Sequence, residues 1–343
     1  MRHAICSVSF TALVLSASTA MAQQQTLYVA GYGGTFEQIM REKVIPPFEQ
    51  AHDVRVEYVA GNSTDSLAKL QAQSGNQQID VAILDDGPMY QAIELGFCAP
   101  IAGLDKSNLF EQAAFPDDKA VATGIIATGL FYNDDYFEEQ GWEAPTSWND
   151  LKDPKYKGMI VIPPINNTYG LHTLIQFARL NGGSEKDIES GFTTMIDEVN
   201  DNVLAYEPSP GKMTELFQSG QAVLGVWGSS RVQALADTGF PATFVYPEEG
   251  AVTLLASACP IAKESASPLA SEFVKSLVTP EVQKIMAVDY GYGPVDKRVE
   301  VPAELAATMP TGERIAKMYN ADWVTINENR EDWTKRWNRE VER

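Results

Sequence analysis

The first residues that could do chemistry form a glycine-rich turn near the start of the chain, Gly31-Tyr32-Gly33-Gly34-Thr35. The turn separates a short apolar run at 27–30 from a segment with helical spacing. Backbone N–H groups at a helix start attract an anionic or carbonyl oxygen. G-Y-G-G-T is not a GxGxxG motif, and no Lys with Ser or Thr follows it as in a phosphate-binding loop. We therefore expect Tyr32, Gly33, Gly34 and Thr35 to contact a ligand other than a nucleotide. The alternative is a tight turn with Tyr32 packed on its neighbours.

Two adjacent acids, Asp85 and Asp86, directly follow the apolar run at 79–84. Carboxylates at the end of a buried strand need either a cation or the N–H groups of a helix start. Asp86 can serve as the N-cap of a helix that begins near Pro88. Both acids are candidate site residues, and Asp85 is the one that we expect to face a ligand.

An uncharged polar turn at 165–170 ends another apolar run and contains Asn167, Thr168 and Tyr169. These side chains can cap the helix that follows, or they can donate and accept hydrogen bonds with a ligand. We count all three as candidate ligand-binding residues.

A fourth turn places Trp227 immediately before Ser229 and Ser230. Trp227 could belong to the core, but a Trp before a polar helix start favours a platform for a flat ligand or an ammonium group. Arg231 follows and either binds a carboxylate or points to solvent. Trp323, far along the chain, could close the same site.

The sequence lacks the common catalytic motifs. It has no GxSxG elbow, no HExxH motif and no Cys–His pair near a polar turn. After residue 22 it contains two His, His52 and His172, and two Cys, so a structural zinc site is not expected. The simplest interpretation is a binding protein that is not an enzyme and that uses neither a metal ion nor a cofactor.

The order of the expected elements predicts an α/β fold with two lobes. Strands and helices alternate from residue 26 to 95 and again from 158 to 230, which is typical of sheets covered by helices. Two long extended segments, 121–134 and 244–263, connect these series and predict a hinge. Ligands of open α/β sheets bind at the carboxyl ends of strands, so the polar turns should meet in a cleft between the lobes. We assign residues 23–125 and 254–299 to lobe one, and 126–253 and 300–343 to lobe two.

The N-terminus predicts export to the periplasm. Residues 1–22 have a basic start, an apolar middle and an Ala-Met-Ala end, which is the pattern of a signal peptide. The formal net charge of −20 disfavours nucleic acid and anionic membranes as partners. In an oxidising compartment, Cys98 and Cys259 suggest a disulfide, with two buried free thiols as the alternative.

Several stretches resemble the periplasmic solute-binding proteins of ABC importers, in the spermidine/putrescine-binding-like branch of extracellular solute-binding family 1. The resemblance is carried by YGGTFEQIMREKVIPPFEQ, IDVAILDDGP, ATGLFYNDDYF, PTSWNDLKDPKYKGMI, LGVWGSS, YPEEGA and ACPIAKESASPLASEFVKSLVTPEVQK. It implies a two-lobed periplasmic binding protein fold of type II, a ligand between the lobes, and an ABC permease as partner. It also implies that Tyr32, Asp85 and Trp227 lie at the cleft. Where polyamine binders carry an aromatic residue and an Asp, this chain has a run that starts at Thr253, which we include as a site residue.

This departure from the polyamine pattern favours a solute with an amine at one end and an acid at the other. Asp85 and Trp227 would hold the ammonium group, and the glycine turn with Ser229 and Ser230 would donate to the acid. A 4-aminobutyrate-like or other amino-acid-derived compound is the leading prediction, and a polyamine is the alternative. An enzyme on the same fold is disfavoured, and so is a ferric-ion binder, because adjacent tyrosines are absent. We expect a monomer.

Overall fold

The computed structural model describes residues 24–306 and 308–342. The predicted signal peptide, residues 1–22, lies outside the described residues. Across the part of the chain that is described, no helix combines the length and the apolar character needed to cross a lipid bilayer.

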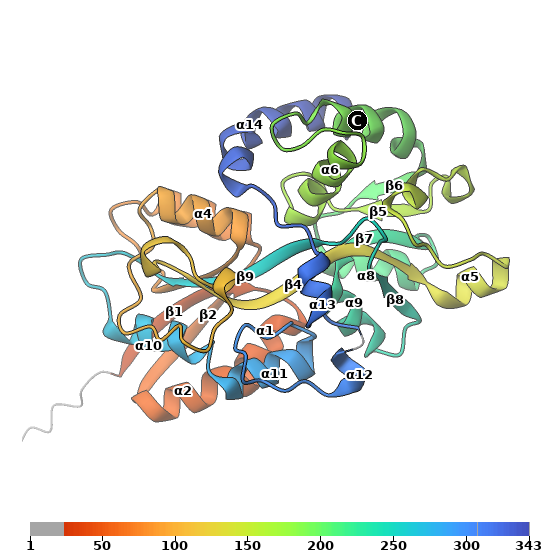
Figure 1. Ribbon diagram of the computed structural model, residues 1–343. Coiled ribbons are helices and arrows are strands. Elements are labelled where there is room, and N and C mark those ends of the chain that lie inside the picture. Colours follow the sequence, from red (N-terminus) through yellow and green to blue (C-terminus); the bar gives the residue numbers. More distant parts are fainter. Residues whose placement is uncertain (1–23, 307, 343) are drawn as a thin grey trace, which may run out of the picture.

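One mixed sheet runs through the described residues (Figure 1), in the order β2-β1-β3-β9-β4-β7-β5-β6, with β8 also paired to β4. Its strands are β1 (Gln25–Tyr32), β2 (Val54–Gly61), β3 (Val81–Asp85), β4 (Val121–Asn133), β5 (Ile160–Ile162), β6 (Val203–Tyr206), β7 (Leu224–Gly228), β8 (Ala242–Val245) and β9 (Val252–Pro260).

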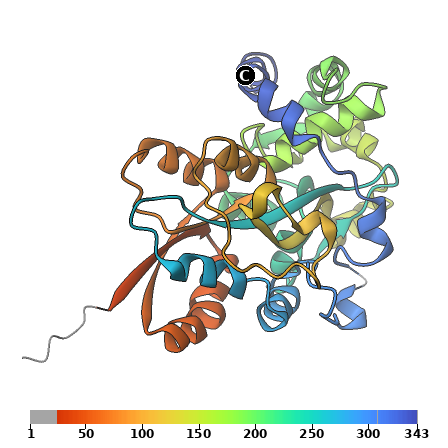
Figure 2. The same cartoon turned by 60° about the vertical axis from the view of Figure 1, so that its left-hand side comes forward.

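Helices cover the sheet on more than one side (Figures 1 and 2). The α-helices are α1 (Thr35–Ile39), α2 (Ile45–His52), α3 (Ser63–Ala72), α4 (Asp86–Glu94), α5 (Asp134–Gln140), α6 (Thr168–Leu180), α7 (Glu189–Thr194), α8 (Pro210–Gln218), α9 (Ser229–Ala236), α10 (Pro268–Ser276), α11 (Pro280–Tyr290), α12 (Ala303–Ala306), α13 (Glu313–Lys317) and α14 (Trp323–Glu340). The π-helical segments are η1 (Met40–Val44) and η6 (Met195–Val199), and the 3-10 segments are η2 (Glu111–Ala113), η3 (Pro116–Asp118), η4 (Trp148–Lys152), η5 (Pro154–Tyr156) and η7 (Asn200–Asn202).

The strands β4 and β9 connect two lobes. We call lobe one the part built on β1, β2 and β3, and lobe two the part built on β5, β6, β7 and β8. β9 pairs with β3 in lobe one, and β4 pairs with β7 and β8 in lobe two. Between the lobes the two strands pair with each other, antiparallel, and both are almost completely buried. The predicted α/β fold with two extended crossings is confirmed.

The second crossing differs in detail from the prediction. The segment 244–263 was expected to be one extended passage. Instead it contains the end of β8, a turn at 246–251 and then β9. The turn is held in place because Glu249 accepts hydrogen bonds from Ser147 and from the backbone N–H of Trp148. Only β9 therefore connects the lobes here, and the exact lobe boundaries remain a prediction.

A disulfide joins Cys98 to Cys259, with their Cα atoms 5.6 Å apart and a sequence separation of 161 residues. Cys98 follows α4, and Cys259 lies on β9 where that strand pairs with β3. The predicted pairing is confirmed, and it fixes the end of β9 to the first lobe.

The last helix, α14, contacts both lobes. Arg336 forms an ion pair with Glu189 of lobe two, at 2.7 Å, and the Trp337 ring packs edge-on against Tyr206. At its start, α14 lies beside α4 of lobe one, and Gln91 donates to Asn327 at 3.1 Å. Figure 1 shows α14 over α6 and close to α4. The C-terminal segment thus spans the two lobes on one side of the sheet.

Candidate functional site

The glycine turn between β1 and α1 is shaped by two of its glycines. A Cβ at Gly31 would lie 2.4 Å from the Tyr58 hydroxyl of the neighbouring strand, so a side chain does not fit there. That hydroxyl donates to the backbone oxygen of Tyr32 at 2.7 Å. Gly34 has a φ of 72°, which favours glycine, and no protein atom lies within 4 Å of a Cβ built there. Gly33 and Gly34 line a cavity, whereas Thr35 is an exposed residue at the first position of α1.

Asp85 lies at the end of β3, where the two lobes meet. Its carboxylate accepts a hydrogen bond from Tyr32 at 2.7 Å and another from Thr168 of lobe two at 2.6 Å. Its backbone N–H donates to the Ser63 hydroxyl at 2.9 Å. Asp85 occupies the N-cap position of α4, but its side chain makes no capping hydrogen bond. The carboxylate is therefore directed across the cleft rather than at the helix that it precedes.

The turn before α6 supplies the facing wall of the cleft. The Asn167 side chain caps α6 by accepting from the Tyr169 N–H at 3.0 Å. A second contact between the lobes lies close by, because the Thr64 hydroxyl donates to the backbone oxygen of Asn166 at 2.9 Å. The Tyr169 ring lies against Gly228, where a Cβ would be 2.4 Å from the tyrosine oxygen. The turn before α6 thus both caps that helix and lines the cleft.

Arg231, near the start of α9, reaches the cleft and is surrounded by tyrosines. Burial lowers the pKa of Arg231, but the neighbouring Tyr290, Tyr169 and Tyr292 outweigh this effect, so that the pKa is raised above its usual value. Within the described residues, no carboxylate lies at ion-pair distance from the guanidinium. A permanently charged donor without an acidic partner is thus available to an anion.

The cleft between the lobes contains two spaces with lining residues in common, which we call the inner space and the outer chamber. The inner space has a volume of about 40 Å³ and is bordered by both Asp85 and Arg231. The outer chamber has a volume of about 470 Å³. Asn62, Asn167, Tyr169 and Arg231 border both spaces.

The structure brings many of the predicted site residues into this cleft. The inner space is lined by Tyr32, Asp85, Asn167, Tyr169 and Ser230, and the outer chamber by Gly33, Gly34, Asn167, Tyr169 and Trp227. Thr168 borders a third space, of about 60 Å³, beside Asp85. Trp227 is 4% exposed and also packs on Phe131, with ring centroids 5.4 Å apart, so it belongs to both the core and the chamber wall.

Two of the predicted residues, Asp86 and Trp323, lie together but outside the cleft cavities. The Trp323 ring covers Gly87, where a Cβ would be 2.3 Å from the indole. Asp86 lies within the first turn of α4 rather than at its N-cap. Burial and the neighbouring Asp85 raise the pKa of Asp86 to about 8, and hydrogen bonds from Trp323, Leu255 and Gly87 only partly offset this effect. These residues form a buried contact between the lobes instead of a ligand surface.

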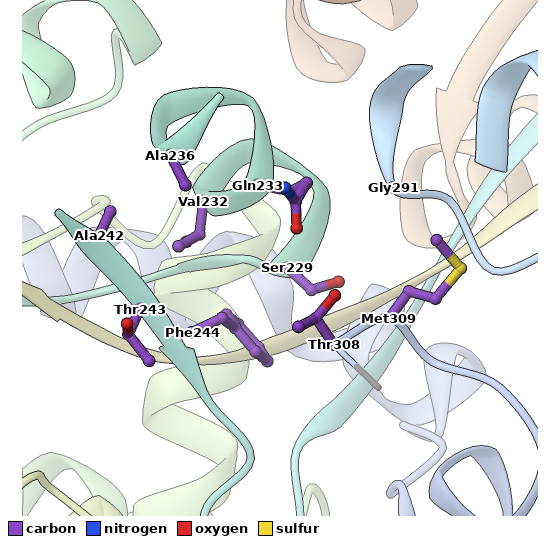
Figure 3. Close-up of a pocket in the computed structure, with 10 residues that line it drawn as sticks. All are labelled: Ser229, Val232, Gln233, Ala236, Ala242, Thr243, Phe244, Gly291, Thr308 and Met309. Carbon is purple, nitrogen blue, oxygen red and sulfur yellow. The ribbon is translucent and has the colours of Figure 1, made fainter. Parts of the chain in front are cut away.

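Thr253 and Ser229 also lie away from the cleft cavities. Thr253 is 3% exposed, and its backbone N–H donates to the Tyr319 oxygen at 2.7 Å. The Ser229 hydroxyl accepts from the Ala127 N–H at 3.2 Å. Figure 3 shows Ser229 at the edge of a separate pocket of about 230 Å³, together with Thr308, Met309 and residues of α9 and β8. Among the described residues that line this pocket, none has a charged side chain.

Sequence reasoning missed two of the tyrosines that surround Arg231. Tyr290 ends α11 and Tyr292 follows Gly291, whose φ of 73° ends the helix. Their alternation in the sequence Tyr-Gly-Tyr was a signal, but no strand end precedes them and their place in the cleft depends on long-range packing. No two tyrosines are adjacent in the sequence, yet the fold brings Tyr32, Tyr169, Tyr290 and Tyr292 together at the inner space. No group of three or more His, Cys, Asp or Glu side chains suited to a metal ion occurs among the described residues.

Comparisons with known proteins agree with this architecture. The profile of a family described as bacterial extracellular solute-binding protein matches residues 43–311. A gamma-aminobutyric acid-binding protein of Pseudomonas aeruginosa is 22% identical over 363 residues, which cover 98% of this chain and 97% of that protein. An uncharacterized protein of Haemophilus influenzae is 26% identical over 223 residues, 62% of each chain, so the match spans less than two thirds of that relative.

Solved structures with the same fold include several transport proteins. An ABC transporter protein from Clostridium perfringens superposes with a TM-score of 0.72 at 24% identity, covering 92% of this chain and 99% of that one. The binding protein AgtB from A. tumefaciens R10, in complex with agropinic acid, gives 0.75 at 20% identity, covering 94% and 100%. A ferric binding protein from Campylobacter jejuni gives 0.71 at 16% identity, covering 92% and 99%. At these identities the likeness shows the fold alone.

Proposed function

The chain belongs to the bacterial extracellular solute-binding proteins, and on that premise we propose that it captures a small amino-acid-like solute between its lobes. In this proposal the protein is exported to the periplasm, is a monomer, and delivers its solute to the permease of an ABC importer. The family and its relatives are transport proteins rather than enzymes, which fits the non-catalytic role.

The observation that carries the proposal is a pair of opposite charges at one small space. Asp85 and Arg231 both border the inner space, and each comes from a different lobe. A solute with an ammonium group and a carboxylate can satisfy both of them when the lobes surround it. The 22% identical relative named for gamma-aminobutyric acid agrees with this class of solute.

Arg231 argues against the alternative of a polyamine. A dication or trication in the inner space would face the Arg231 guanidinium as well as Asp85, and no carboxylate among the described residues forms an ion pair with that guanidinium. Like charges in a poorly hydrated site repel each other strongly. We therefore do not retain the polyamine.

The tyrosine cluster raises ferric ion as a second candidate. Four tyrosines line the inner space, and the solved structures with this fold include a ferric binding protein from Campylobacter jejuni. In this chain, however, no group of three or more His, Cys, Asp or Glu side chains suited to a metal ion occurs among the described residues. Arg231 at the same space also repels a bare cation.

A panel of solutes tests the proposal. The folded mature protein is mixed with amino acids, 4-aminobutyrate, putrescine, spermidine or ferric citrate, and the midpoint of thermal unfolding is measured. Ligands that bind only the folded state raise the midpoint. We expect shifts with compounds that carry both an amine and a carboxylate. A shift with polyamines alone, or a visible tyrosinate–iron absorption band, would overturn the proposal.

The charge pairing is tested by Asp85→Asn. Leaving a buried charged group without its partner costs about 2–5 kcal/mol, so binding of the strongest amino acid in the panel should weaken at least ~30-fold by calorimetry. Asp135→Asn is the matched control, because Asp135 is exposed on α5, and it should bind like the wild type. Equal affinity of Asp85→Asn and wild type would show that Asp85 does not bind the ammonium group.

A further inference from the structure

The two spaces of the cleft differ about tenfold in volume, and this difference restricts the shape of a solute that fits them. The inner space, at about 40 Å³, has room for about three water-sized groups. It can receive charged groups of a solute at Asp85 and Arg231 on its border, but it cannot hold a long chain. The outer chamber, at about 470 Å³, shares Tyr169 and Arg231 with the inner space as lining residues.

The walls of the outer chamber are mostly apolar. Lobe two contributes the side chains of Pro163, Pro208, Pro210, Met213 and Trp227. Lobe one contributes Ala60 and backbone at the glycine turn, where Gly33 and Gly34 leave the chamber unobstructed. Such walls favour an aliphatic or flat aromatic group, which would pack on the Trp227 ring.

The charges at the outer chamber restrict that group further. Two acids, Asp65 and Glu207, border the chamber, and Arg231 is the only basic residue in its described lining. The Asp65 carboxylate accepts from the Asn62 side chain at 2.8 Å, and Glu207 accepts from the Ser209 N–H at 2.7 Å. Because Arg231 is shared with the inner space, a second acid in the chamber would meet carboxylates without a free basic partner.

We propose that the solute has two parts: an amino-acid head in the inner space and a bulky, neutral or cationic body in the outer chamber. This inference rests on the proposed function and selects within it. It favours an amino acid with a large substituent over unsubstituted 4-aminobutyrate, which leaves the chamber empty. The side chains of Ala60, Pro208 and Trp227 determine which bodies fit in the outer chamber.

The experiment compares amino acids that share one head and differ in their bodies. Calorimetry with the mature protein uses alanine, phenylalanine, arginine and glutamate. We expect phenylalanine and arginine to bind about tenfold or more tightly than alanine, because they fill the chamber, and glutamate to bind more weakly than either. Alanine binding as tightly as phenylalanine and arginine would overturn the inference.

Ala60→Trp then fills the chamber from an exposed position on β2, where the larger side chain leaves the core unchanged. It should weaken phenylalanine and arginine about tenfold and change alanine by less than about twofold. Pro208→Trp tests the opposite wall, and Ala51→Trp, exposed on α2, is the control that should change nothing. If Ala60→Trp and Pro208→Trp leave all affinities unchanged while Asp85→Asn abolishes binding, the inference fails and the proposed function stands. If no amino acid binds at all, both fail.

Discussion

Asp85 and Asp86 are adjacent, yet their carboxylates have opposite surroundings. Asp85 accepts hydroxyl hydrogen bonds from both lobes at the inner space. Asp86 is 3% exposed and lies under Trp323, where it accepts from the Leu255 N–H at 3.3 Å. The first side chain is available to a solute, and the second is a buried acid whose protonation affects the stability of the fold.

This difference predicts a pH dependence of stability. The pKa of Asp86 is raised to about 8 in the folded chain, from a usual value of 3.8. Between pH 3.8 and about pH 8 the folded state binds more protons than the unfolded state, because Asp86 stays protonated only in the folded chain. The free energy of unfolding therefore falls as the pH rises through this range, and the stabilising contribution of the protonated Asp86 is lost by about pH 8. The pKa of His172 is lowered by burial to about 3, so its effect has the opposite sign and is limited to pH values below its usual 6.5.

The interval from pH 6.5 to 8 therefore isolates Asp86. We expect the thermal midpoint of the wild type to fall across this interval, and that of Asp86→Asn to fall less. Asp135→Asn, which removes an exposed charge, should keep the wild-type slope. Identical slopes for wild type and Asp86→Asn, measured by circular dichroism, would contradict a proton held by Asp86.

The sequence predicted where several strands end. It did not show in every case which of two adjacent residues at such an end faces the cleft. A buried apolar run followed by polar residues identifies where a strand ends, which is why Asp85, Tyr169 and Trp227 were recognised. The sequence favoured Asp85 over Asp86 for the cleft, but it did not separate Ser229 from Ser230, because which neighbour faces the cleft depends on the rotation of the helix that begins there. That rotation is determined by packing against distant segments, such as Trp323 on Gly87 and Ala127 at Ser229.

At the scale of elements, the glycines in the turn between β1 and α1 have separate structural roles. Gly31 allows Tyr58 of β2 to approach, and Gly34 provides a positive φ before α1. A ligand can then approach Gly33 and Gly34 along the wall of the outer chamber. Gly31 thus allows close packing, whereas Gly33 and Gly34 leave room for a ligand.

Gly31→Val and Gly34→Val should separate these two roles. Gly31→Val places side-chain atoms against the Tyr58 ring, so it should lower the thermal midpoint strongly. Gly34→Val meets no protein atom within 4 Å, and its cost comes from a backbone with φ of 72° and ψ of −141°, which is essentially restricted to glycine, typically about 1–3 kcal/mol. Thermal unfolding of both variants checks the order, and a larger loss for Gly34→Val would contradict it.

The disulfide stabilises the joint between α4 and β9. It closes a loop with a sequence separation of 161 residues, so in the chain-entropy model it contributes up to about 4–5 kcal/mol to the free energy of unfolding. We expect the double variant Cys98→Ala, Cys259→Ala to unfold at clearly lower denaturant concentration than the wild type. Thiol titration of the unreduced, denatured wild type should find no free thiol, and two thiols per chain would contradict the bond.

At the scale of the whole molecule, the lobes are joined by more than the two crossing strands. Trp323 and Asn327 connect α14 to α4 in lobe one, while Arg336 anchors the same helix to lobe two. The periodic helical segments and the crossings were predictable from the sequence, because apolar patterning determines them. The position of α14 was not, because its polar surface gives little indication of which lobe it covers.

Binding of a solute that contacts both lobes should favour the compact arrangement. Small-angle scattering of the mature protein with a saturating amino-acid ligand is expected to give a smaller radius of gyration than without ligand. Asp85→Asn at the same ligand concentration serves as the control and should remain at the unliganded value if it does not bind. An unchanged radius in the saturated wild type would contradict closure.

The pairing of β3 with β9 also has a consequence for the order in which the protein folds. β3 ends at residue 85, but its partner β9 begins at residue 252, so lobe one lacks a strand until most of the chain has been synthesised. Contacts that are distant in sequence form slowly, because a long loop must close before they stabilise the fold. A growing chain that cannot complete its first lobe stays unfolded for longer, and an unfolded chain is the form that can be threaded through a narrow translocation channel.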